Sequence, residues 1–301
     1  CEFVKGLQGD NPRYLKTVST PKHFAANNEE HNRSSCNARM SERDLREYYL
    51  PAFERCIVDG KAQSIMMAYN AVNDVPCTVN IYLIKKVLRG DWNFNGYIVS
   101  DCSAPEWMVT KHKYVKNLEA AATLALKAGL DLECGDRVYT APLLKAYNEY
   151  MVSEAEIDSA AYHILRGRML LGLFDDPSQN PYNKIEPSVI GCKEHQELAL
   201  ETARQSMVLL KNQKNFLPLN RKKIRSIAVV GISAAHCEFG DYSGNPKNTP
   251  VSVLDGIKKY AENANIKVVH APWVSSGTDF DPISKGFFPN GLKAEYFDNS
   301  D

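Results

Sequence analysis

The first half of the chain alternates short apolar segments with longer stretches whose apolar residues recur at helical spacing. Four segments have the length and composition of buried strands: residues 16–24, 63–70, 96–101 and 129–134. Three stretches between them are predicted helices: residues 41–60, 80–92 and 117–129. The first opens on Ser41 and Asp44, a capping-box type of start, and the third closes on Gly129, a common helix stop. This alternation predicts right-handed crossovers and a parallel sheet.

Polar residues gather where the predicted strands end. They are Lys22, His23, Tyr69, Asn70, Asp101 and Glu133. In parallel α/β folds ligands bind beyond the carboxyl ends of the strands, so these side chains are expected to share one face. Four such strands suggest half of an eight-stranded barrel. A full barrel takes ~250 residues, so we expect its N-terminal half to lie outside this chain.

The second half repeats the alternation on a smaller scale. Residues 153–174 are a predicted helix with a capping box at Ser153 and Glu156, and the Pro- and Asn-rich stretch that follows is a predicted linker. Beyond it we expect a helix, a strand, and then a helix followed by a strand: residues 192–213, 224–231 and 251–271. This order predicts a second α/β domain, a layered sandwich.

Composition excludes several classes of function. Lys and Arg number 36, as do Asp and Glu, and no block of like charge runs through the chain, so neither nucleic acid nor a membrane is an expected partner. The longest apolar runs are far shorter than the ~20 residues that cross a bilayer. The eight Cys form no CxxC pair, and no Cys/His spacing fits a zinc site, so no metal is predicted.

Several motifs, taken together and in order, resemble those of glycoside hydrolase family 3. They include "KHFAANNEEHNR", "MMAYNAVNDVPCTVN", "LRGDWNFNGYIVSDC", "AGLDLECG", "LGLFDDP" and "SMVLLKNQKNFLPL". The resemblance implies a (β/α)8 TIM-type barrel followed by an α/β sandwich domain. It also implies a retaining, exo-acting β-glycosidase that removes terminal non-reducing sugars. The last eleven residues resemble the first strand of a protective-antigen-type β-sandwich insertion.

These expectations divide the chain into four parts. They are a partial barrel at 1–174, a linker at 175–191, a partial α/β sandwich at 192–290, and the start of the insertion at 291–301. The remainder of the protein's own chain is expected to complete both domains. The chain has neither an initiator Met nor a visible signal sequence, which we interpret as a processed end or a cut.

Asp101 matches the family's nucleophile motif, at the end of an apolar strand. Retaining glycosidases use two carboxyl groups ~5–5.5 Å apart, one as nucleophile and one as acid/base. An N-cap of the following helix is the alternative role for Asp101. The family's acid/base residue is expected outside this chain. We assign that role to none of Glu29, Glu30 and Glu238.

The resemblance assigns sugar contacts to the segment around the first strand end. Lys22 and His23 would donate to sugar hydroxyls, and the lysine charge would keep Asp101 ionised. The alternative is a solvated Lys beside a core His. Arg33 matches a sugar-contacting arginine, or it forms a surface ion pair with Glu29 or Glu30.

Further candidates line the same face. Tyr69 matches a tyrosine beside the nucleophile and would orient Asp101, unless it is a core residue. Met66 could form an apolar wall or belong to the core. Glu133 could bind a sugar hydroxyl or a basic neighbour.

Cys102 replaces the Trp that follows the nucleophile in many β-glucosidases, which is typical of the β-xylosidase side of the family. We hypothesise that Cys102 and Cys134 lie close together near the sugar. A disulfide between them needs a Cα–Cα distance of ~5.5–6 Å. The pair would narrow the space for the C6 hydroxymethyl group of a hexose. Two buried free thiols are the alternative.

The sequence thus predicts a β-xylosidase-like enzyme acting on an oligosaccharide or glycoside. A β-glucosidase, or a carbohydrate-binding relative without turnover, are the alternatives. No cofactor is implied, because acetal hydrolysis by carboxylates needs none. The substrate class alone suggests a periplasmic or secreted protein.

Overall fold

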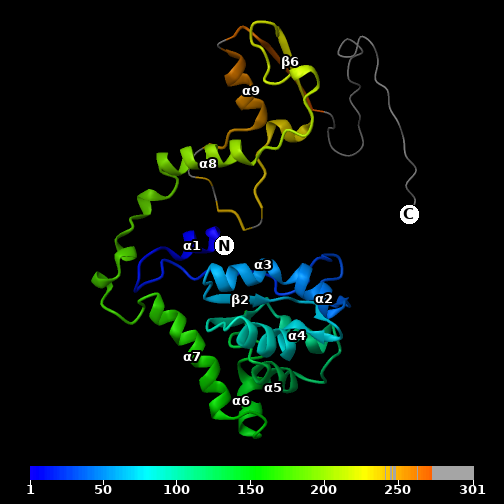
Figure 1. Ribbon diagram of the computed structural model, residues 1–301, viewed down its shortest axis with the longest axis vertical. Coiled ribbons are helices and arrows are strands. Elements are labelled where there is room, and N and C mark those ends of the chain that lie inside the picture. Colours follow the sequence, from blue (N-terminus) through cyan, green and yellow to red (C-terminus); the bar gives the residue numbers. More distant parts are fainter. Residues whose placement is uncertain (241, 245, 247–248, 263, 273–301) are drawn as a thin grey trace, which may run out of the picture. The chain divides into compact units, whose positions relative to one another are not determined.

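The computed structural model describes residues 1–240, 242–244, 246, 249–262 and 264–272. The chain divides into two compact units, Cys1–Ile185 and Glu186–Asp301, each described by itself below (Figure 1). The division at Ile185 falls inside the predicted linker, residues 175–191. The predicted insertion, residues 291–301, lies outside the described residues.

Unit 1 is built around parallel strands with helices between them. Its strands are β1 (Asn37–Ala38), β2 (Ser64–Met67), β3 (Ala71–Val72), β4 (Val75–Pro76) and β5 (Tyr97–Ser100). β2 and β5 pair in parallel, with Ile65 opposite Ile98. Isolated parallel bridges join Phe24 to Met67 and Val99 to Leu132. The predicted strand segments therefore lie side by side in sequence order, which confirms the α/β fold class.

The first predicted strand, residues 16–24, is only partly formed, and that prediction is corrected. The segment runs beside β2, where Ser64 N donates to Ser19 O and Phe24 N donates to Met66 O. Pro21 accepts a bond from Met66 N but has no N–H of its own to donate, so the ladder is incomplete. The peptide bonds before His23 and Ala25 are cis. The last predicted segment, residues 129–134, is likewise reduced to one bridge.

The helices of unit 1 include those predicted at residues 41–60, 80–92, 117–129 and 153–174, the first of them as four short elements, together with others that were not predicted. They are α1 (Glu2–Gln8), α2 (Glu42–Asp44), η1 (Leu45–Tyr49), α3 (Pro51–Glu54), η2 (Arg55–Asp59), η3 (Cys77–Val79), η4 (Tyr82–Asp91), α4 (Ala104–Thr110), α5 (Leu118–Ala128), α6 (Ala141–Asn148), α7 (Glu154–Leu170), η5 (Pro177–Gln179) and η6 (Pro181–Lys184). The predicted capping box of Ser153 and Glu156 is present at α7. α5 ends at Gly129, whose φ of 103° favours glycine.

The strands bury one face against these helices. Ile65, Met67 and Ile98 are 0 % exposed and belong to one apolar core with residues of the helices around them. Because side chains alternate along a strand, Met66 lies on the opposite face, paired across the sheet with Val99. The helical layer thus packs on one face of the sheet, and Met66 and Val99 lie on the other.

Unit 2 is a second α/β unit. Its elements are η7 (Pro187–Val189), α8 (Lys193–Ser206), η8 (Gln213–Asn215), β6 (Ser226–Val230), η9 (Ile232–Ala235), α9 (Val253–Glu262) and β7 (Lys267–Ala271). β6 and β7 pair in parallel, as the helix between them requires. The helix predicted for residues 192–213 ends early, because Met207 is extended at ψ 126°. The consecutive apolar residues that follow lack helical spacing.

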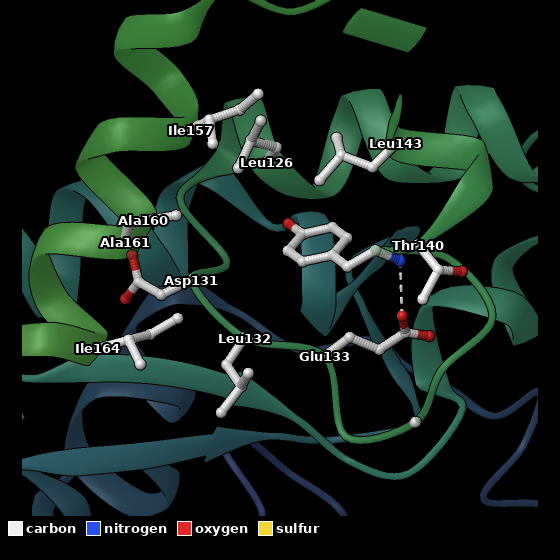
Figure 2. A pocket seen from close by; sticks show the side chains of 12 residues that line it. Leu126, Asp131, Leu132, Glu133, Thr140, Leu143, Ile157, Ala160, Ala161 and Ile164 are labelled. Carbon is white, nitrogen blue, oxygen red and sulfur yellow. Dashed lines mark hydrogen bonds between the residues drawn. The ribbon is translucent and has the colours of Figure 1, made fainter. Parts of the chain in front are cut away.

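A cavity of about 290 Å³ lies among α5, α6, α7 and the last predicted strand segment (Figure 2). Its walls include Leu126 of α5, Leu143 of α6 and Ile157 of α7. Leu126 also belongs to a small apolar cluster with Ala146 of α6. The cavity is therefore part of the packing between helices, and none of its twelve lining residues is Asp101 or His23.

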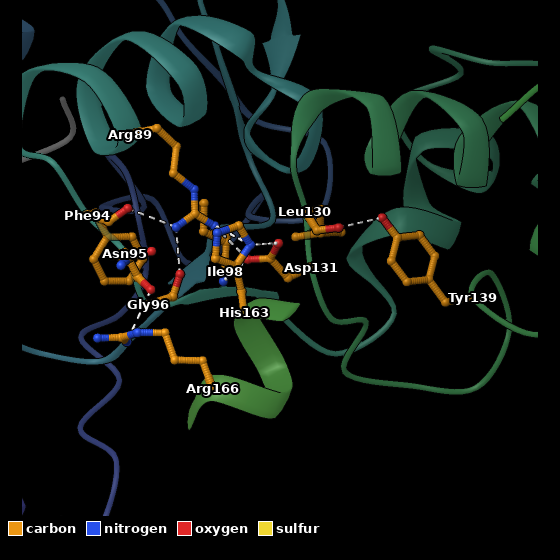
Figure 3. A network of polar contacts seen from close by, with 10 residues as sticks. All are labelled: Arg89, Phe94, Asn95, Gly96, Ile98, Leu130, Asp131, Tyr139, His163 and Arg166. Atoms are coloured by element: carbon orange, nitrogen blue, oxygen red, sulfur yellow. Dashed lines mark hydrogen bonds and ion pairs between the residues drawn. The ribbon is translucent and has the colours of Figure 1, made fainter. Parts of the chain in front are cut away.

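A buried polar network joins η4 and α7 to β5 through Asp131 (Figure 3). The Asp131 carboxylate accepts hydrogen bonds from Arg89 Nη2 at 2.7 Å and from Ile98 N at 2.7 Å. Its other oxygen lies 2.9 Å from His163 Nδ1 of α7. Arg89 also donates to the carbonyl oxygens of Phe94 and Gly96. Burial lowers the pKa of Arg89, and the Asp131 carboxylate opposes that shift.

We expect Asp131→Asn to destabilise the protein by about 3 kcal/mol, because it removes the negative charge that compensates a largely buried guanidinium. The Asp131 side chain is 3 % exposed and that of Arg89 is 21 % exposed. Urea unfolding followed by circular dichroism measures the loss. The matched control is Glu47→Gln, which breaks an exposed pair with Arg43 and should change little. Equal unfolding midpoints for the two variants would contradict this role of Asp131.

Candidate active site

Asp101 lies directly after β5, and its backbone amide still bonds to β2 through Met67 O at 3.0 Å. The residue is 7 % exposed. Oδ1 accepts from Cys102 N at 2.8 Å, whereas Oδ2 is buried with no hydrogen-bond partner in the described part of the chain. The N-cap of α4 is Ser103, so Asp101 does not take the alternative role of helix cap. The carboxylate is thus held at the strand end, with Oδ2 accepting no hydrogen bond from the described residues.

His23 approaches this carboxylate from the neighbouring chain segment. Its Nε2 lies 3.3 Å from Asp101 Oδ2, without the alignment of a hydrogen bond. Burial lowers the pKa of His23, Asp101 acts in the opposite direction, and the charges of Lys22 and Arg33 lower it further. His23 is therefore held neutral, so one ring nitrogen can donate to an uncharged hydroxyl. Lys22 itself is exposed.

Arg33 and Tyr69 are brought together beside these residues. The guanidinium carbon of Arg33 lies 5.2 Å from the centre of the Tyr69 ring. Arg33 also forms the ion pair with Glu30 that was the alternative for it, at 2.9 Å. The two side chains of that pair are 43 % and 76 % exposed, so the pair contributes little to stability. Arg33 thus keeps a charged group near Asp101 that a polar ligand can engage.

The hypothesised contact between Cys102 and Cys134 is present as a disulfide, with the two Cα atoms 4.5 Å apart. Ser103 N donates to Cys134 O, which further ties the two strand ends together. Cys102 is exposed and directly follows Asp101, so the disulfide stands at the edge of the site. Met66 is half-buried, on the face of β2 away from the helical core.

Glu133 lies at the end of the last predicted strand segment and is 7 % exposed. Its carboxylate accepts hydrogen bonds from Val138 N at 2.9 Å and Tyr139 N at 2.6 Å. These bonds satisfy amides at the turn before α6 and hold the loop 135–140. The expected contact of Glu133 with a sugar hydroxyl or a basic neighbour stays a prediction.

Two residues of the site were missed in the sequence analysis. Trp107 of α4 stacks on Tyr69, with ring centres 4.2 Å apart and an angle of 24° between ring planes. His112 Nε2 lies 2.8 Å from the carbonyl oxygen of Tyr69. The only sign in the sequence was a Trp six residues after Asp101, on a short helix. Its contact with Tyr69 could not be predicted from the spacing of the residues.

Two negative findings apply to the described residues. Among them no group of three or more His, Cys, Asp or Glu side chains is placed to hold a metal ion. Nor is any helix among them long and apolar enough to cross a membrane.

Comparison with known proteins gives concordant results. Residues 1–167 match the glycosyl hydrolase family 3 N-terminal domain, and residues 207–296 match the glycosyl hydrolase family 3 C-terminal domain. The chain is 39 % identical over 276 residues to probable beta-D-xylosidase 7 of Arabidopsis thaliana, which covers 87 % of this chain and 36 % of that protein. The chain therefore spans about a third of the length of this curated relative.

Solved structures agree with this match. A GH3 exo-beta-xylosidase in complex with a xylobiose aziridine activity-based probe superposes with a TM-score of 0.83 at 31 % identity, covering 91 % of this chain and 36 % of that one. A beta-glucosidase from Listeria innocua superposes with a TM-score of 0.79 at 30 % identity, covering 91 % and 38 %. These neighbours confirm the predicted fold class. With its N-terminal match extending over more than half of its length, the chain belongs to glycosyl hydrolase family 3.

Proposed function

We propose that this chain carries the nucleophile of a retaining, exo-acting β-glycosidase with β-xylosidase-like specificity. The observation that carries the proposal is the Asp101 carboxylate, buried at the end of β5 with Oδ2 unbonded and facing His23. Most buried polar atoms have a hydrogen-bond partner, so an unpartnered carboxylate oxygen calls for an explanation, and a nucleophile supplies one. Membership of glycosyl hydrolase family 3 and the β-xylosidase names among the relatives support the same proposal.

The reaction proceeds by two displacements. Asp101 Oδ2 attacks the anomeric carbon, and the bond to the leaving-group oxygen breaks while that oxygen takes a proton from an acid/base carboxyl group. We propose that this second group lies outside this chain. The glycosyl ester is then hydrolysed by a water molecule that returns its proton to the same group, which restores the original anomeric configuration.

The groups around Asp101 recognise the sugar. Lys22, His23 and Arg33 are the proposed hydrogen-bond donors to the sugar, whose hydroxyls accept from such groups. A neutral His23 forms no ion pair with Asp101, so Oδ2 stays available for attack on the anomeric carbon. Met66 of β2 and Tyr69, two residues beyond that strand, are the proposed wall of the sugar site.

The disulfide is the proposed basis of sugar selectivity. It stands at Cys102, directly after the nucleophile, and occupies room that a hexose needs for its C6 hydroxymethyl group. A pentose lacks that group. A β-glucosidase of the same family is the second candidate, because solved β-glucosidases also superpose on this chain. A hydrolase of plant-type oligosaccharides meets its substrate outside the cytoplasm, so we propose a periplasmic or secreted location.

We expect a 2-deoxy-2-fluoro-β-xyloside with a good leaving group to label Asp101, because the fluorine slows breakdown of the glycosyl ester. Peptide mapping of the complete protein by mass spectrometry locates the label. Asp101→Asn should lower kcat by about 10⁴-fold and abolish labelling. The control Asp158→Asn, an exposed residue of α7, should behave as wild type. A label on another residue would refute the assignment, and absence of both label and turnover would favour a non-catalytic binding protein.

Removal of the disulfide should relax the choice of sugar. We expect the variant with Cys102→Ala and Cys134→Ala to raise the kcat/KM of an aryl β-glucoside relative to that of the β-xyloside by about tenfold, the scale on which one small group is discriminated. Cys237→Ala, at an exposed free cysteine, is the control. An unchanged ratio would remove the disulfide from the account of selectivity and leave the nucleophile assignment untouched.

A further inference from the structure

α4 begins three residues after Asp101, and its Trp107 contacts Tyr69. Ala104 N, in the first turn, donates to the carbonyl oxygen of Asp101 at 3.0 Å. One turn later the Trp107 ring stacks on Tyr69 at 4.2 Å. His112, just beyond the helix, donates from Nε2 to the Tyr69 carbonyl oxygen at 2.8 Å. The segment 101–112 therefore holds Tyr69 at its ring and at its backbone.

Tyr69 in turn is a contact surface for Arg33. The guanidinium carbon lies 5.2 Å from the ring centre, within the range of a cation–π interaction. The ion pair of Arg33 with Glu30 is too exposed to fix a long side chain alone. A rigid aromatic surface limits the rotamers of Arg33, and that surface is rigid because Trp107 lies against it.

From this chain of contacts we infer that Trp107 is a positioning residue of the active site, which sets Arg33 for sugar binding through its stack on Tyr69. The inference rests on the proposed function, since it assumes that Arg33 contacts the sugar. Trp107 itself is half-buried and is not placed against the reacting atoms. Trp107 acts on Arg33 through two contacts, its own stack on Tyr69 and the contact of Arg33 with the Tyr69 ring. No rearrangement of the fold is required.

The kinetic consequence follows from what Arg33 does. A contact with a sugar hydroxyl that exists in both the bound substrate and the transition state affects KM and leaves kcat nearly unchanged. We therefore expect Trp107→Ala to raise KM for an aryl β-xyloside about tenfold, with kcat within about threefold of wild type. Trp107→Phe keeps an aromatic ring on Tyr69 and should restore KM to within about threefold.

Two controls separate positioning from simple destabilisation. Val109→Ala truncates a partly buried residue of the same helix that packs on the core, so it should lower the melting temperature without raising KM. In an Arg33→Ala background, Trp107→Ala should raise KM by less than about twofold further, because the group it positions is gone. The measurements use the complete protein.

The outcomes distinguish this inference from the proposed function. A Trp107→Ala variant with wild-type KM, or a full effect of Trp107→Ala when Arg33 is already absent, overturns the inference while labelling of Asp101 persists. A rise in KM for Val109→Ala equal to that for Trp107→Ala overturns the inference as well. A wild-type protein that neither hydrolyses a β-glycoside nor is labelled at Asp101 overturns the proposed function, and the inference with it.

Discussion

The contact between Arg89 and Asp131 is the interaction on which the geometry of unit 1 depends. It joins residues 42 positions apart in sequence, and Asp131 also accepts from Ile98 N near the start of β5 (Figure 3). This pins the register of β5 against the segment that follows α5. A slip of one residue would turn every side chain of β5 to the other face. Asp101 and Cys134 reach their neighbours because this end of the two segments is fixed.

The Asp131 network and the candidate catalytic residues lie at opposite ends of their strands. The network of Asp131 lies at the amino end of its segment, whereas Asp101, His23 and the disulfide lie at the carboxyl ends. Barrel proteins share this division, with stabilising polar groups on one face and reactive groups on the other. The strands and the helices packed on them hold the amino and carboxyl ends at a fixed distance. Loops at the carboxyl end can therefore vary without loss of the fold.

Local patterns were sufficient for much of this arrangement. The apolar run before Asp101 indicated β5, and Ser153 with Glu156 marked the start of α7. What the sequence did not predict depends on contacts that residue spacing does not show. The Glu133 carboxylate binds amides of the loop after it, a role that no feature of the sequence indicated. The role of Trp107 was not predicted because its partner, Tyr69, follows a different strand. Pro21 was the one readable sign that the first segment could not form a full ladder.

The bare oxygen of Asp101 also has a meaning for the energetics of the molecule. A buried acceptor without a donor weakens the folded state relative to one that is satisfied. A small molecule that brings a donor to Oδ2 removes that penalty and binds only the native chain, so its binding raises resistance to unfolding. The increase in melting temperature then reports the binding itself, whether or not the bound molecule undergoes a reaction.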